Sequence, residues 1–266
     1  MAEERLDSNV QEILQCVEGK QDFLLSGGAG CGKTYALVLA LRELSKKYPH
    51  IHIACITYTN AAADEIKERA NIPHLTVQTI HDFLWSQISS FPNEMKDVLE
   101  ELVNAYDEDT NKDTCIKNPD PSTKFLLLND VIIQYREYNR LSEGIISHDE
   151  VLKLSKAMYE KYDKLRMILC DKYQCIFVDE YQDTSPLVIN ILLDYKPTKG
   201  HKNVIGFFGD SMQSIYEGSV GNIQDYTNSG AVKEIQRTQN RRNPASVISL
   251  ANKIRDDGLV QEPSNM

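Results

Sequence analysis

One stretch of the sequence decides the fold, and it reads Gly27-Gly28-Ala29-Gly30-Cys31-Gly32-Lys33-Thr34. Its spacing, G-x-x-x-x-G-K-[ST], is that of a phosphate-binding loop. Glycines let the backbone curl until its N–H groups point at phosphate oxygens, and the first turn of a helix adds a partial positive charge. We expect all eight residues to bind a nucleoside triphosphate, with Lys33 on the β- and γ-phosphates and Thr34 on Mg²⁺.

The sequence on either side of this loop supports the same interpretation. Asp22–Ser26, before the loop, is a short strand candidate, and Lys33–Lys47, at its end, has a helical pattern. The alternative is a glycine turn without function. From average residue usage, a chain this long matches the loop pattern by chance roughly once in a hundred, and the strand–loop–helix order lowers that figure further.

Apolar β-rich runs alternate with helical patterns along much of the chain. The expected strands are Ile51–Ile56, Leu75–Val77, Cys175–Val178, Val204–Phe208 and Val232–Ile235. Helices are expected at Asn60–Ala70 and Ile80–Ile88. Strands separated by helices indicate an α/β fold, with a parallel sheet and helices on both faces.

Residues 91–167 break this alternation. We predict a helical insertion there, between the two parts of a discontinuous lobe formed by residues 1–90 and 168–266. The expected helices of the insertion are Met95–Tyr106, Lys124–Tyr138 and His148–Tyr162. Its first part is rich in aspartate and glutamate, which accounts for much of the net charge of −10. We interpret that acidity as a solvated helix face rather than an interaction surface.

A pair of carboxylates, Asp179 and Glu180, directly follows the apolar run Cys175–Val178. In a parallel sheet the carboxyl end of a buried strand lies where ligands bind. Asp179 there would hold Mg²⁺ through its water shell, and Glu180 would act as the general base that activates water. An acidic pair at a strand end is also common without function, so the phosphate loop is what favours the catalytic interpretation.

Composition limits the class of protein. No apolar run approaches the roughly 20 residues that span a bilayer, and the N-terminal segment has no signal-peptide pattern, so we expect no membrane contact. The six cysteines form no C-x-x-C pair, which favours free thiols and a cytoplasmic location over a disulfide framework or a zinc site. A net charge of −10 means that any nucleic-acid contact must be a local groove.

Several segments resemble the conserved boxes of the UvrD/Rep/PcrA-type superfamily 1 DNA helicases. Residues 178–184, Val-Asp-Glu-Tyr-Gln-Asp-Thr, are similar to the Asp-Glu-x-Gln-Asp box of that family. The other similar segments are 57–63 (Thr-Tyr-Thr-Asn-Ala-Ala-Ala), 79–83 (Thr-Ile-His-Asp-Phe), 209–216 (Gly-Asp-Ser-Met-Gln-Ser-Ile-Tyr) and 239–242 (Gln-Asn-Arg-Arg). The boxes occur in the family's order and cover most of the chain outside the insertion. The resemblance implies a RecA-like lobe that binds ATP and Mg²⁺.

The resemblance also implies roles for single residues. Gln11 matches the glutamine that reads adenine, with a solvated helix residue as the alternative. Gln213 would sense the γ-phosphate, and Arg242 would clamp it as charge develops in the transition state. Their alternatives are an ordinary loop glutamine and a surface ion-pair partner.

Four further residues are implied along a single-stranded DNA path: Tyr58, Asn60, His81 and Tyr216. Aromatic and imidazole rings stack on any base, at about 1–3 kcal/mol each. Core packing is the alternative for the two tyrosines. The family usually continues its Gln-Ser-Ile-Tyr box with a tryptophan and an arginine, where this chain has Glu217-Gly218-Ser219, which puts tight gripping of DNA in doubt.

Two functions remain open. The first is the N-terminal ATPase lobe of a helicase, which hydrolyses ATP as single-stranded DNA is translocated and unwound, in the 3′→5′ direction by resemblance. The family's second lobe is missing from the sequence, so we expect it to come in cis or from a partner protein. The second function is a nucleotide-gated module that binds DNA or protein in a repair or phage-defence complex, without unwinding.

Overall fold

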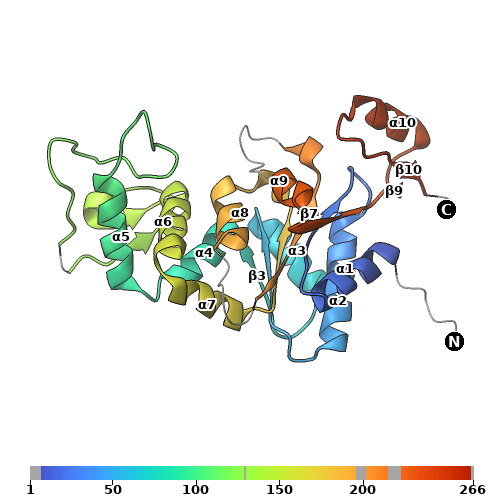
Figure 1. Cartoon of the computed structure of the whole chain (residues 1–266), viewed down its shortest axis with the longest axis horizontal. Coiled ribbons are helices and arrows are strands. Elements are labelled where there is room, and N and C mark those ends of the chain that lie inside the picture. Colours follow the sequence, from blue (N-terminus) through green and yellow to red (C-terminus); the bar gives the residue numbers. More distant parts are fainter. Residues whose placement is uncertain (1–6, 129, 196–201, 215–222, 265–266) are drawn as a thin grey trace. The chain divides into compact units, whose positions relative to one another are not determined.

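The computed structural model describes residues 7–128, 130–195, 202–214 and 223–264 (Figure 1). The chain forms two compact units. The sheet unit comprises Met1–Thr79, Cys170–Ile189 and His201–Met266, and the helical unit comprises Ile80–Leu169 and Asn190–Gly200. The predicted boundaries, a lobe of residues 1–90 and 168–266 and an insertion of residues 91–167, stay a prediction.

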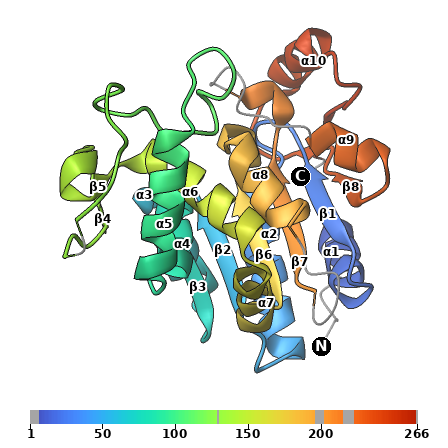
Figure 2. The same ribbon diagram turned by 60° about the vertical axis from the view of Figure 1, so that its left-hand side comes forward.

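A six-stranded parallel sheet forms the centre of the sheet unit, in the order β3-β2-β6-β7-β1-β8. Its strands are β1 (Asp22–Ser26), β2 (Ile53–Thr57), β3 (Leu75–Thr79), β6 (Cys175–Asp179), β7 (Val204–Gly209) and β8 (Val232–Gln236). Figure 2 shows β3, β2, β6, β7 and β1 side by side in this order. The predicted α/β class with a parallel sheet is therefore confirmed.

Three helices cover one face of this sheet: α1 (Ser8–Glu18), α2 (Lys33–Lys47) and α3 (Asn60–Ala70). Alternate strand residues point at them, because successive side chains of a strand face opposite sides. Phe23, Phe177 and Phe208 meet there with ring centroids 5.5–5.7 Å apart, and Phe23 meets each of the other two edge to face. These rings pack β1, β6 and β7 against one another in the core below the three helices.

Short elements follow β6, β7 and β8 in the sheet unit. They are η2 (Tyr181–Asp183), η3 (Ser211–Gln213), α9 (Ile223–Asn228), α10 (Ala245–Ile254) and the two-residue strands β9 (Gln239–Asn240) and β10 (Glu262–Pro263). β9 and β10 pair in parallel. Two helices, α7 (Asp163–Lys172) and α8 (Pro186–Leu193), cross from one unit to the other along the chain.

The helical unit is built on three helices: α4 (Ile80–Ile88), α5 (Pro92–Asn104) and α6 (His148–Lys161). Helix α6 begins at a capping box, in which Ser147 and Glu150 satisfy each other's backbone groups. The short strands β4 (Gln134–Tyr135) and β5 (Ile145–Ile146), with η1 (Leu141–Glu143) between them, complete the ordered elements. No helix in the described residues is long and apolar enough to cross a membrane.

The helix predicted at Lys124–Tyr138 is wrong, because the described residues of this segment form no helix and Gln134–Tyr135 forms a strand. Its burial alternates: Phe125 and Leu127 are buried while Leu126 and Leu128 are exposed, which is the period of a strand. Side chains of helix α5 supply the missing partners, since Asn104 Oδ1 accepts from Phe125 N at 2.8 Å and the Glu100 carboxylate accepts from Leu127 N at 2.9 Å. These partners make the extended form stable without a neighbouring strand.

Candidate nucleotide site

The carboxyl ends of three neighbouring strands meet at one edge of the sheet. Ser26 of β1 pairs with Gly209 of β7, and Asp179 of β6 pairs with Phe208 of β7. The phosphate loop leaves β1 at this edge and is tied to β7 by a hydrogen bond from Gly27 N to Gly209 O of 3.2 Å. The loop, the acidic pair and the box at 209–216 therefore begin from adjacent strand ends.

The phosphate loop has the backbone geometry that its glycines permit. Gly30 and Gly32 have φ angles of +89° and +76°, in the left-handed region that side chains disfavour. Gly32 is also the residue that caps the start of α2. The Lys33 side chain is buried, and its Nζ donates to Gly27 O at 2.9 Å. The lysine thus lies folded over the loop, within the curve expected to receive phosphate oxygens.

Donors from the segment 237–243 hold the outward carbonyls of the loop. Asn240 and Asn243 donate from their amides to Ala29 O, at 2.7 Å and 3.0 Å, and Arg241 N donates to Gly30 O at 3.2 Å. Arg237 Nε donates to Cys31 O at 2.6 Å. In a trans peptide the N–H points opposite to the C=O, so these bonds turn the N–H groups of the following residues toward the concave side.

Asp179 is a buried carboxylate with an unfilled acceptor. It is 3% exposed, and its Oδ1 has no hydrogen-bond partner among the described residues. Burial, reinforced by the charge of Glu180, raises the pKa of Asp179 to about 7, while Lys33 acts in the opposite direction. A buried carboxylate oxygen with no partner suits a hard cation such as Mg²⁺, and Thr34, in the first turn of α2, is the second oxygen donor predicted from the sequence.

Glu180 is held in an unusual backbone conformation. Its φ is +49°, a region that a non-glycine residue occupies at a cost and that is frequent at functional sites. Gln182 fixes the carboxylate by donating from Nε2 to Glu180 Oε2 at 2.7 Å, and its Oε1 accepts from Asp210 N at 3.0 Å. Gly209 permits this approach, because a Cβ there would lie 2.2 Å from Gln182 Oε1. Sequence reasoning quoted Gln182 in its box without assigning it this role.

Gln213 follows β7 in η3 and is bound to an aspartate. Its Nε2 donates to Asp210 Oδ2 at 2.6 Å, and Arg255 donates to both oxygens of Asp210 at 2.8 Å and 3.0 Å. Burial opposes ionisation of Asp210, but hydrogen bonds from Arg255 and Gln213 leave its pKa lowered. Arg255 was not singled out from the sequence, since 45 residues separate it from its partner.

Arg242 and Gln11 both lie in the sheet unit. Arg242 is exposed, and its Cβ lies 2.9 Å from where a Cβ on Gly30 would stand, so it flanks the phosphate loop. Gln11 is an exposed residue near the start of α1, and its backbone N donates to Asp7 O at 3.0 Å. The exposed positions leave both side chains accessible to a ligand.

The residues predicted for DNA fall in different parts of the chain. Tyr58 and Asn60 follow β2 in the sheet unit, and Tyr58 is 41% exposed, which excludes the core-packing alternative for this tyrosine. His81 lies in α4 of the helical unit, half-buried, with its ring centroid 4.5 Å from that of His148. Tyr216 and the Glu217–Ser219 departure lie outside the described residues.

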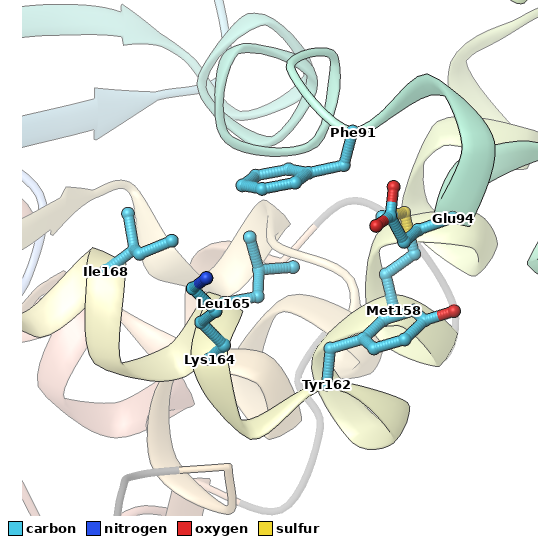
Figure 3. A pocket seen from close by; sticks show the side chains of 7 residues that line it. All are labelled: Phe91, Glu94, Met158, Tyr162, Lys164, Leu165 and Ile168. Atoms are coloured by element: carbon cyan, nitrogen blue, oxygen red, sulfur yellow. The ribbon is translucent and has the colours of Figure 1, made fainter.

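The helical unit has a separate pocket of about 110 Å³ (Figure 3). Residues at the start of α5, the end of α6 and along α7 line it: Phe91, Glu94, Met158, Tyr162, Lys164, Leu165 and Ile168. None of the residues predicted for nucleotide or DNA is among them. The pocket is mainly apolar, with Glu94 and Lys164 as its charged residues.

Comparison with known proteins gives a family and several relatives. A family model described as an AAA domain matches residues 11–219. The Gabija protein GajB of Bacillus cereus is 30% identical, over 95% of this chain and 50% of that protein. The ATP-dependent DNA helicase PcrA of Staphylococcus epidermidis is 26% identical, over 98% and 41%, and the helicase Rep of Escherichia coli is 25% identical, over 93% and 43%.

Among solved structures, the crystal structure of the Pif1 helicase from Candida albicans matches with a TM-score of 0.43 and 14% identity, over 87% of this chain and 39% of that one. The chain spans about half the length, or less, of the three relatives named. Homology to PcrA- and Rep-type helicases and to GajB agrees with the resemblance found in the sequence.

Proposed function

The chain belongs to the AAA domain family whose model matches residues 11–219, and from that premise we propose that it is the lobe of a superfamily 1 DNA helicase that binds and hydrolyses ATP with Mg²⁺. One observation carries the proposal: Lys33, at the end of the loop that follows β1, is close enough to lower the pKa of Asp179, whose buried Oδ1 at the end of β6 has no partner among the described residues. A cation and a metal-ready carboxylate beside a glycine loop form the minimum site for nucleotide phosphates.

Each group of the site has a defined task in this proposal. Lys33 exchanges its bond to Gly27 O for the β- and γ-phosphates of the nucleotide. Thr34 and Asp179 hold Mg²⁺, which when bound neutralises phosphate charge. Glu180, oriented by Gln182, accepts the proton of the attacking water.

Residues further from the loop have finer roles. Arg242 clamps the γ-phosphate, Gln213 senses it, and Gln11 reads the adenine. The Gln213 amide donates one N–H to the Asp210 carboxylate, and its second N–H and its carbonyl oxygen are the groups that would meet the γ-phosphate and water. In this proposal, a change in the Gln213–Asp210 bond carries the signal from the nucleotide to DNA.

The DNA side of the proposal rests on the homology to helicases. Single-stranded DNA runs along Tyr58, Asn60, His81 and Tyr216, and 3′→5′ translocation follows the family. A second lobe, in cis or from a partner protein, supplies the facing side of the nucleotide cleft in this proposal, and this chain spans half or less of the length of the relatives named. A reducing cytoplasm belongs to the same proposal, because all six cysteines are buried and free.

A second candidate is a nucleotide-gated binding module of a repair or defence complex that does not unwind DNA. The 30% identity to a Gabija protein favours it, being the highest identity among the three relatives named. The two candidates differ in a simple measurement. A helicase lobe is expected to hydrolyse ATP faster when single-stranded DNA is added, whereas a gated module would bind ATP with turnover that ignores DNA.

The variant Glu180→Gln tests the chemical part of the proposal. The carboxamide keeps the shape and the hydrogen bond to Gln182 but cannot accept a proton, so ATP binding should persist while hydrolysis falls by about 10²–10⁴-fold. Single-turnover hydrolysis and a separate binding titration measure the two quantities. Glu68→Gln, the same change at an exposed glutamate of α3, is the control and should turn over as wild type does. Turnover by Glu180→Gln within twofold of wild type would exclude Glu180 as the base.

A further inference from the structure

Arg237 is a buried arginine whose donors are shared between the phosphate loop and the start of α1. It is 4% exposed and lies directly after β8. Nε donates to Cys31 O at 2.6 Å, while Nη1 and Nη2 donate to the two carboxylate oxygens of Asp7, each at 2.9 Å. Nη1 also donates to Asn9 Oδ1 at 3.1 Å. The guanidinium therefore forms a bidentate buried ion pair and a bond to the loop at the same time.

The two ends of this link are rigid parts of the sheet unit. Asp7 caps α1, since its side chain accepts from Asn9 N at 3.0 Å. On the other side, the backbone N of Arg237 donates to Ser26 O at 2.8 Å, the last residue of β1 before the loop. Arg237 thus holds the root of the loop through its backbone and the top of the loop through its side chain.

Holding Cys31 O fixes the direction of the next peptide group. The peptide bonds of the described residues are all trans, so the Gly32 N–H points away from Arg237. The peptide held in this way directly precedes Lys33, whose Nζ folds back over the loop to Gly27 O. An unheld Cys31–Gly32 peptide could rotate, because Gly32 tolerates many backbone angles.

We propose that Arg237 is a positioning residue for nucleotide binding, which keeps the phosphate loop in its binding conformation and joins it to the helix that carries Gln11. This inference rests on the proposed ATP site. No ligand touches Arg237 in the proposal, and its effect passes through the Cys31–Gly32 peptide and through Asp7.

Two variants of Arg237 separate its two bonds. Arg237→Lys keeps the positive charge beside Asp7, but a lysine point charge cannot donate in two fixed directions. Arg237→Gln removes both the positive charge and the guanidinium donors that point at Asp7 and Cys31 O. The control is Lys233→Gln, which removes the exposed ion pair of 3.8 Å between Lys233 and Glu12, on the same strand and helix. Mg-ATP affinity by calorimetry and thermal unfolding are measured on the full 266-residue chain.

The expected result is a loss of Mg-ATP affinity of about tenfold or more for both Arg237 variants, with Arg237→Lys keeping an unfolding midpoint closer to wild type. Lys233→Gln should bind as wild type does. If Arg237 only stabilised the fold, its replacement would lower the unfolding midpoint and leave the Mg-ATP affinity of the folded protein unchanged. Affinity within twofold of wild type in Arg237→Lys overturns the inference, and failure of wild type itself to bind Mg-ATP overturns the proposed function instead.

Discussion

Gly30 shows how a single residue shapes the site. Its φ of +89° lies in the left-handed region, and a Cβ there would stand 2.7 Å from Asn240 Oδ1 and 2.9 Å from Arg242 Cβ. Glycine is therefore required twice at this position, once by the backbone angle and once by the close approach of the segment that holds Ala29 O. The two requirements can be separated by experiment.

Gly30→Ala is expected to lower the free energy of unfolding by at least about 1–2 kcal/mol, the cost of a side chain at a left-handed residue, and to weaken Mg-ATP binding. Gly230→Ala is the matched control, because Gly230 has a φ of +76° and open space around it. Gly230→Ala should lower the free energy of unfolding by a similar amount but leave the affinity for Mg-ATP unchanged. Urea unfolding and a nucleotide titration measure both, and equal ATP affinity in Gly30→Ala and wild type would contradict this account of the loop.

Sequence motifs located the site residues whose contacts lie close to them in the sequence. The phosphate loop directly follows β1, and the pair Asp179 and Glu180 lies at the carboxyl end of β6. Their positions after apolar runs therefore located both at the same edge of the sheet. Arg237 and Arg255 escaped prediction because their partners, Asp7 and Asp210, are 230 and 45 residues away. No local pattern marks an arginine that pairs at such a distance.

At the scale of elements, the least predictable segment was the one between α5 and β4. Its apolar residues, including Leu126 and Ile132, suggested a helix, yet both are exposed. The partners that make it extended are side chains of α5, namely Glu100 and Asn104. The strands β1, β2, β6 and β7, in contrast, consist mostly of apolar residues, and all six strands of the sheet were predicted to within two residues.

A histidine pair joins α4 to the start of α6 within the helical unit. Burial, and then the charge of His148, lowers the pKa of His81 below 6.5, although Asp149 and Asp82 act in the opposite direction. A histidine with a lowered pKa binds fewer protons in the folded state than in the unfolded state. Stability from this group is therefore fully present above the unfolded pKa of about 6.5 and is lost as the pH falls through the lower folded pKa.

Protonation of His81 between about pH 7.5 and about pH 5.5 should consequently lower the unfolding midpoint, whereas protonation of Asp179, whose pKa is raised to about 7, should raise it over the same range. His148→Asn removes the charge beside His81 and leaves Asp179 unchanged, so acidification should lower the midpoint less, or raise it more, in this variant than in wild type. His50→Asn, at an exposed histidine between α2 and β2, is the control and should behave as wild type. Calorimetric midpoints at the two pH values test this, and an unchanged pH dependence in His148→Asn would show that the pair does not contribute.

At the scale of the whole molecule, the net charge of −10 limits how DNA can be bound. We expect weak, sequence-independent binding of single-stranded DNA that falls at least tenfold between about 50 mM and about 200 mM salt. Tyr58→Ala should weaken it further by about 1–3 kcal/mol, the range for loss of one stacking ring, whereas Tyr58→Phe should not. Fluorescence anisotropy with a labelled oligonucleotide gives these affinities. A strong preference for one duplex sequence, or equal binding by Tyr58→Ala, would refute the proposed DNA path.

Phosphate release from Mg-ATP by the purified chain, compared with that of Lys33→Ala, tests the central claim most directly. Lys33 is the cationic side chain of the loop that we propose to bind the β- and γ-phosphates, and alanine removes its charge while leaving the first turn of α2 helical. The account predicts Mg-dependent turnover in wild type, faster with single-stranded DNA, and only background release from Lys33→Ala. Equal turnover by the two proteins would contradict it.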